Sequence, residues 1–279
     1  MFDVWTRAEL RAMGMTSRAI RASLDSGQLI RARKGHYVRG DAPESLRRAA
    51  HVGGRLGCLS LLSECGVFVA DSTELHVHMQ RGDSRMRAVT GSGALAPVAQ
   101  RRGLVLHWHA LIETPTSGAV GIVDAVSHSI RCQEARFAVA TLDSAIHLGV
   151  LAVDQLDEVF AAVPARFRVI RPLIDSRAEA GTETLVRLML RRWSCNVELQ
   201  VGIDGVGRVD LVVNGWLVVE CDSKQFHSDW DQQRADYRRD RALAALGFTV
   251  LRLTAQDILY RPEEVASALR GLIFANRRG

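Results

Sequence analysis

The sequence contains little lysine, no long hydrophobic run and no paired cysteine motif. Lys34 and Lys224 are the only lysines among 36 basic residues, an arginine bias that is typical of a GC-rich genome and is weak evidence of function. No apolar run approaches the roughly 18 residues that a membrane-spanning helix needs, and the N-terminal MFDVWTRAEL lacks the apolar segment of a signal peptide. Five scattered cysteines without a C-x-x-C pair predict reduced thiols in a cytoplasmic protein with no membrane partner.

Several catalytic motifs are also missing. The chain has no G-x-x-x-x-G-K-[ST] loop and no dinucleotide-binding glycine fingerprint, which argues against nucleotide hydrolysis. Its serines have no G-x-S-x-G context, so the sequence offers no candidate serine nucleophile.

The positive charge of the chain lies at its N-terminus. The 279 residues carry a net charge of +5, with a pI of about 9.2. Residues 1–56 contain 11 basic and 5 acidic residues, so the positive excess of the chain lies in this segment. A basic segment of this kind favours binding to nucleic acid.

Residues 5–39 predict a small helix-turn-helix with a wing. Thr6 and Glu9 form a capping box for a first helix that ends at Gly14, and a second helix starts at Thr16 or Ser17 and closes at Gly27. Two short strands then surround Lys34-Gly35. In such a module the second helix lies in the major groove and the wing contacts phosphates. The predicted DNA-binding residues here are Arg18, Arg21, Arg31, Arg33, Lys34 and Arg39. A basic surface on a protein-binding winged helix is the alternative.

Residues 208–227 hold three carboxylates inside apolar strands. The runs VDLVV and WLVVE flank Asn214-Gly215, a hairpin signal, and are apolar on both faces, which predicts central strands of a covered sheet. Asp210, Glu220 and Asp222 lie in or beside these runs. Buried carboxylates are costly unless they are paired or bind a metal, so the pattern predicts a site for a hard cation such as Mg²⁺. A structural pair of hydrogen-bonded carboxylates is the alternative.

The loop length decides whether two of these acids share a face. With a plain two-residue turn, Asp210 would lie opposite Val219 and would point away from Glu220. A shared metal therefore predicts an odd-length loop or a bulge, with Gly215 in the left-handed region.

From about residue 182 to 273 the chain resembles the Vsr-like branch of the PD-(D/E)xK nuclease superfamily. The matching pieces, in order, are the helix GTETLVRLMLRRW, the strand ELQVGI, the two acidic strands, and the helix and strand DYRRDRALAALGFTVLRL. The resemblance implies a restriction-endonuclease-like mixed sheet flanked by helices. One departure is Asp222 at the usual lysine position, although this branch commonly has an acid there.

The resemblance also implies a set of site residues. Asp210 and Glu220 would hold Mg²⁺ or Mn²⁺, with Glu183 reaching the metal directly or through water. The side chains implied for orienting water or phosphate are Gln200, Lys224 and His227, with Asp222 as a further ligand or as a partner of His227. Arg239, on the following helix, would neutralise phosphate.

The N-terminal and middle regions resemble AbiEi-type antitoxins of bacterial toxin–antitoxin systems. The resemblance rests on the basic helix-turn-helix and on CLSLLSECGVF, LHVH and DSAIHLG. We therefore expect an α/β (α+β) protein with a winged helix in 1–40, a middle α/β domain in 41–170 and a nuclease domain in 171–279. A toxin–antitoxin partner and a homodimer are both compatible with this organisation.

Three local patterns give further expectations. The pairs His76/His78 and His107/His109 each share a strand face, and four imidazoles can ligate zinc, but exposed polar positions are the favoured interpretation. Asp143 and His147 are spaced to pair along one helix. Thr182 is placed to cap the helix that contains Glu183.

Taken together, the sequence predicts a DNA-binding, metal-dependent endonuclease that hydrolyses phosphodiester bonds in DNA repair or defence. The rival hypothesis is a non-catalytic DNA-binding regulator or antitoxin-like protein with an inactive nuclease fold. Asp222 at the lysine position favours the regulator, whereas the combination of Glu183, Asp210, Glu220 and His227 favours the enzyme. RNA remains open as a substrate.

Overall fold

The chain folds into two compact units. In the computed structural model, one unit comprises residues 1–133 and 150–169, and the other comprises residues 134–149 and 170–279. The structure describes residues 2–83, 86–89, 91, 93–94, 102–222 and 230–276. The predicted mixed α/β class is confirmed, and the described residues form helices and three small sheets. Within the described residues, no helix is long and apolar enough to cross a membrane. The three-domain division predicted from the sequence stays a prediction.

The N-terminal segment has the two helices and the hairpin expected from the sequence. Its elements are β1 (Trp5–Thr6), α1 (Arg7–Ala12), α2 (Ser17–Asp25), β2 (Leu29–Arg33) and β3 (His36–Arg39), with the sheet order β1-β3-β2. Thr6 and Glu9 form the predicted capping box, and Thr16 caps α2. The core that joins these elements is Leu10, Ile20, Leu29 and Tyr37.

The rest of the first unit surrounds a second small sheet. Its elements are α3 (Glu44–Val52), β4 (Arg55–Leu56), α4 (Cys58–Glu64), β5 (Leu75–His78), β6 (Leu104–His107), α5 (Ile122–Cys132), η2 (Val153–Gln155), α7 (Leu156–Ala162) and η3 (Ala165–Leu173), which runs on into the second unit. β4 is antiparallel to β5, and β5 is parallel to β6.

The second unit contains a four-stranded mixed sheet. Its elements are α6 (Ala135–His147), α8 (Gly181–Arg191), β7 (Val197–Ile203), β8 (Gly207–Val213), β9 (Leu217–Asp222), α9 (Trp230–Ala245), β10 (Thr249–Thr254), α10 (Ala255–Tyr260) and α11 (Pro262–Asn276). The order is β10-β9-β8-β7, antiparallel except for the parallel pair β9/β10. The two acidic strands are therefore central, as predicted.

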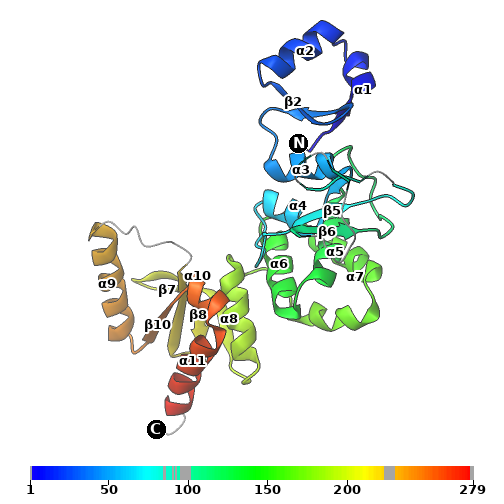
Figure 1. Cartoon of the computed structure of the whole chain (residues 1–279). Coiled ribbons are helices and arrows are strands. Elements are labelled where there is room, and N and C mark those ends of the chain that lie inside the picture. The colour runs from blue at the N-terminus through cyan, green and yellow to red at the C-terminus, as the bar shows by residue number, and fades with distance from the viewer. Residues whose placement is uncertain are drawn as a thin grey trace. The chain divides into compact units, whose positions relative to one another are not determined.

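Helices cover both faces of this sheet. Figure 1 shows α9 on one side of it and α8 on the other. On the α9 side, Leu243 packs in one cluster with Val212 of β8 and Val218 of β9. Because side chains alternate along a strand, residues two positions from these valines also project toward α9. Asp210 and Glu220 occupy such positions.

A buried ion pair fastens α6 to α8. Asp143 Oδ2 lies 2.8 Å from Arg187 Nη2 and accepts a hydrogen bond from Thr184 Oγ1 at 2.8 Å, and both charged side chains are buried. The predicted Asp143–His147 pair is wrong, because His147 Nδ1 instead lies 3.2 Å from the Ser176 carbonyl oxygen. The i, i+4 spacing along one helix favours a pair between Asp143 and His147. In the packed structure Asp143 pairs instead with Arg187 of the neighbouring helix α8.

Candidate active site

Strands β8 and β9 separate where their two carboxylates meet. The ladder between them ends at the pair Leu211–Val219, whereas β8 stays paired with β7 and β9 with β10 on both sides of this point. At this point, which we call the fork, Asp210 Oδ2 accepts a hydrogen bond from the Cys221 amide at 2.7 Å. Glu220 Oε2 accepts one from the Asp210 amide at 3.1 Å. Each carboxylate thus accepts a hydrogen bond from a backbone amide of the other strand, at the point where the β8/β9 ladder ends.

The loop between β8 and β9 holds three residues, 214–216. Val213 pairs with Leu217, and the left-handed backbone of Asn214 (φ 51°) and Gly215 (φ 76°) closes the turn. The odd loop length predicted from the sequence is therefore confirmed. It puts the two acids of the fork on the same face, since directly opposed residues of antiparallel strands share a face.

The two acids of the fork hold their protons more tightly than usual. Burial raises the pKa of both Asp210 and Glu220, and the charge of Asp210 raises that of Glu220 further. Arg239 of α9 opposes this, because its Nη2 lies 2.9 Å from Glu220 Oε1, and it also donates to the Arg208 carbonyl. Sequence reasoning placed Arg239 among the phosphate-binding residues; in the structure it holds Glu220.

Glu183 lies buried at the start of α8. Its carboxylate accepts hydrogen bonds from the amides of Ala180 at 3.0 Å and Glu179 at 3.1 Å, and from Gln200 Nε2 at 2.8 Å. Burial raises the pKa of Glu183 to about 7, and the charge of Asp210 adds to the rise. This acid therefore belongs to the same electrostatic system as the fork.

The predicted Thr182 cap is wrong. The helix begins two residues earlier than a Thr182 cap requires, so that Ala180 takes the cap position and Thr182 lies inside the first turn with its hydroxyl buried. Glu183 caps the helix instead, from the third helical position. This capping gives Glu183 a structural role in addition to any role in the site.

Gln200 holds Glu183 from a strained backbone. It has a φ of 55° inside β7, although the pairs Leu199–Leu211 and Val201–Val209 keep one register on both sides of it. A left-handed conformation at such a residue costs about 1–3 kcal/mol and is concentrated at functional sites. The observed strain supports the sequence-based choice of Gln200 as a site residue.

The remaining predicted residues lie at the end of β9. Asp222 is exposed, with Oδ2 3.7 Å from Arg252 Nη1, and Arg252 Nη2 lies 2.8 Å from Asp240 of α9. Sequence reasoning missed Arg252, because its place opposite Glu220 depends on the parallel pairing of β10 with β9. Lys224 and His227 lie outside the described residues.

The N-terminal basic residues differ in their surroundings. Arg39 Nη2 pairs with Asp41 at 2.7 Å, and the half-buried Arg33 lies 3.2 Å from the His36 ring. Among the described residues, no acid lies within 4.0 Å to form an ion pair with four exposed members of the predicted set, Arg18, Arg21, Arg31 and Lys34.

Comparison with known proteins bears on this site directly. The family REase_MTES_1575, which is restriction-endonuclease-like, matches residues 183–273. The C-terminal region contains a nuclease-like domain. The match starts at Glu183 and includes the whole fork, so the candidate site lies inside this nuclease-like domain.

Similarity to curated proteins extends over most of the chain. Two uncharacterized proteins of Mycobacterium tuberculosis, from strains CDC 1551 and H37Rv, are each 25% identical over 281 residues. The alignments cover 91% of this chain and 96% of each relative. The similarity to these relatives therefore extends well beyond the region that the family matches.

The raised pKa of Glu183 predicts a pH-dependent stability difference. The folded protein keeps the Glu183 proton up to about pH 7, whereas the ordinary glutamate pKa is 4.5. The folded state therefore binds more protons in this window, and the parent loses stability as pH rises. From pH 5 to pH 8, without metal, the free energy of unfolding of the parent is expected to fall by about 2–3 kcal/mol relative to Glu183→Gln. Urea unfolding at several pH values measures this difference, and parallel curves would contradict the assignment.

Proposed function

We propose that the protein is a metal-dependent endonuclease that hydrolyses phosphodiester bonds of DNA. The observation that carries the proposal is the fork, where Asp210 and Glu220 share one face inside the region matched by a restriction-endonuclease-like family. An odd hairpin loop and a split ladder produce this arrangement.

The residues of the fork fit a divalent cation. Carboxylate oxygens are the ligands that Mg²⁺ prefers, and a cation would offset the burial and repulsion that raise the pKa values of Asp210, Glu220 and Glu183. Mg²⁺ or Mn²⁺, when bound, would polarise the scissile phosphate and make the attacking water more acidic. Asp210 and Glu220 would hold it, and Glu183 would act through water because its carboxylate already accepts three hydrogen bonds.

The other side chains would position the reactants. Gln200 keeps the Glu183 carboxylate in place through its amide. Lys224 or His227 would orient the water or the phosphate, and His227 would donate a proton to the leaving oxygen. Asp222 stands where the superfamily usually has lysine, so one of these two residues supplies the missing cation.

The N-terminal segment would supply most of the affinity for DNA. Its exposed basic residues can neutralise phosphates, whereas residues 173–279 contain 15 basic and 15 acidic residues. The nuclease-like domain thus carries the chemistry, and the basic segment brings it to the duplex.

A non-catalytic DNA-binding regulator is the second candidate. The Arg239–Glu220 ion pair favours it, because an arginine that neutralises a fork carboxylate can replace a metal ion structurally. Asp222 at the lysine position favours it as well.

A DNA cleavage assay with defined metal ions distinguishes the endonuclease from the non-catalytic regulator. Supercoiled plasmid and single-stranded DNA are incubated with the parent and with Asp210→Ala, in Mg²⁺, in Mn²⁺ and in EDTA. We expect the parent to cleave with either metal, and we expect both EDTA and Asp210→Ala to abolish cleavage. Duplex binding that is retained and salt-sensitive, with no cleavage in either metal, would establish the regulator instead.

A further inference from the structure

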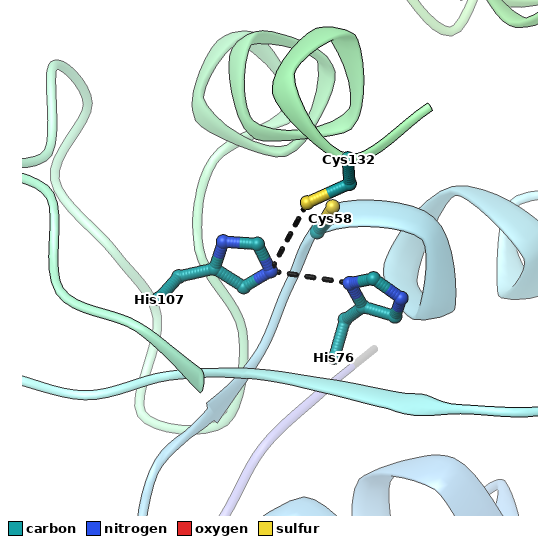
Figure 2. Close-up of side chains that lie close together, drawn as sticks. All are labelled: Cys58, His76, His107 and Cys132. Carbon is teal, nitrogen blue, oxygen red and sulfur yellow. Dashed lines mark hydrogen bonds between the residues drawn. The ribbon is translucent and has the colours of Figure 1, made fainter. Parts of the chain in front are cut away.

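Two cysteines and two histidines of the first unit converge on one point. Their ligand atoms (two sulfurs and two ring nitrogens) all lie within 4.8 Å of one another. His76 Nδ1 is 3.1 Å from His107 Nε2, which is 4.0 Å from Cys132 Sγ. Figure 2 shows these side chains and Cys58 pointing toward one another from separate elements. We call these four residues the Cys/His cluster.

Four elements bring the cluster together. The parallel register pairs His76 with Val105 and His78 with His107, so that His76 and His107 lie on one face of the β5/β6 pair. Cys58 is the first residue of α4 and Cys132 the last residue of α5. The cluster therefore ties both helices to the sheet of the first unit.

The backbone supports this placement. Cys58 has a φ of 49°, a left-handed conformation that costs a non-glycine residue about 1–3 kcal/mol and is concentrated at functional sites. Ser60 Oγ accepts a hydrogen bond from the His76 amide at 2.9 Å, which fixes β5 against α4. The fold thus positions the Cys58 thiol at the expense of backbone strain and positions His76 through a hydrogen bond to α4.

The dimensions match a tetrahedral metal site. Zn²⁺ bonds of about 2.05 Å to nitrogen and 2.3 Å to sulfur give a tetrahedron with edges of roughly 3.3–3.8 Å. The observed separations of 3.1 Å and 4.0 Å bracket these edges. We propose that Cys58, His76, His107 and Cys132 bind one Zn²⁺ as a structural site.

The donor chemistry selects zinc over the cation of the fork. Thiolate and imidazole are zinc ligands, whereas Mg²⁺ takes oxygen. Four protein ligands fill a tetrahedral sphere, as in sites that stabilise a fold, and three of the four residues are buried while Cys132 is exposed and offers access. This site is chemically and structurally independent of the proposed nuclease activity.

The second histidine of each H-x-H pair, His78 or His109, is not part of the Cys/His cluster. His78 and His109 contact His128 of α5, with ring centroids 5.9 Å and 5.3 Å apart; His107 also stacks on His128, at 5.0 Å. The ligand set is thus one histidine from each pair with two distant cysteines, not four imidazoles. The interpretation of these histidines as exposed is wrong for His76, His78 and His107, which are buried.

Metal analysis of the reduced full-length protein tests the site. After chelation and reloading with Zn²⁺, elemental analysis is expected to find one tightly held Zn²⁺ per chain. Co²⁺ loading is expected to give the visible bands of tetrahedral cobalt with a thiolate charge-transfer band. Cys132→Ser is expected to weaken Zn²⁺ binding at least about 100-fold, because losing a ligand costs more affinity than losing a hydrogen-bond partner of a ligand. The bound metal is also expected to raise the melting temperature of the parent.

Two controls keep the test decisive. Cys65→Ser changes a cysteine of the same unit outside the cluster, and Asp210→Ala changes the fork; both are expected to bind Zn²⁺ as the parent does. Cys132 lies at an exposed helix end, and circular dichroism checks that its variant folds. Failure of the reduced parent to bind Zn²⁺, unchanged binding by Cys132→Ser, or a Cys58–Cys132 disulfide in the protein as isolated would overturn the proposal.

Discussion

The variant Glu220→Gln is expected to lose DNA cleavage by about 10³-fold or more while remaining folded. A bound metal supplies several kcal/mol of transition-state stabilisation, and about 4 kcal/mol corresponds to 10³-fold in rate. Glutamine keeps the shape of Glu220 but removes the charge that holds a cation. Burial raises the pKa of Glu220, and Arg239, its ion-pair partner, is partly exposed to solvent, so we expect the fold to persist with a neutral side chain at this position. Initial rates of plasmid cleavage in Mg²⁺ measure the loss.

Glu198→Gln is the matched control for this variant. Glu198 lies on β7 of the same sheet but is exposed, so the same chemical change there is expected to leave the rate within about 3-fold of the parent. Thermal unfolding of both variants separates a lost activity from a lost fold. If Glu220→Gln cleaved at the rate of Glu198→Gln, the fork would not be the catalytic site.

Replacing Asp143 with alanine is expected to destabilise the second unit by about 3–5 kcal/mol. Asp143 is fully buried and accepts hydrogen bonds from Arg187, from Thr184 and, at 2.7 Å, from the Asp175 amide. Its removal leaves the buried Arg187 guanidinium without a counter-charge, which is the costly way to break a buried ion pair. Denaturant unfolding of the full chain measures the change, and the melting temperature of this unit is expected to fall by roughly 10 °C.

The double variant Asp143→Ala/Arg187→Met separates two effects on stability: the unpaired charge of Arg187 and the side-chain volume lost at Asp143. Because it removes both partners, it is expected to be less destabilised than the sum of the single variants. Asp204→Ala, at an exposed turn between β7 and β8, is the control and is expected to change stability by less than about 1 kcal/mol. Additive effects in the double variant would show that the ion pair is not what fastens α6 to α8.

Much of the candidate site could be predicted because its constraints are local. The acids are conspicuous within apolar strands. Because side chains alternate between the two faces of a strand, the length of the hairpin loop decides whether two opposed acids lie on the same face of the sheet. That argument predicts an odd-length loop or a bulge, and the structure has the three-residue loop 214–216. The partners of the acids could not be predicted in this way: Arg239 reaches Glu220 from a helix nearly twenty residues further along the chain, and its sequence context fits phosphate binding equally well.

The sequence by itself determined the helices and the hairpin of the N-terminal segment, the capping box at Thr6 and Glu9, and the condition that Asp210 and Glu220 share a face only across an odd-length loop or a bulge. Each depends on hydrophobic period, turn chemistry or short spacing, which act over a few residues. Only the tertiary structure joined α6 to the nuclease-like domain through Asp143 and Arg187, and only it brought the Cys/His cluster together from four separate elements. Such contacts form between residues 18 to 74 positions apart in the sequence, and packing decides them because no local pattern specifies which buried polar groups will meet.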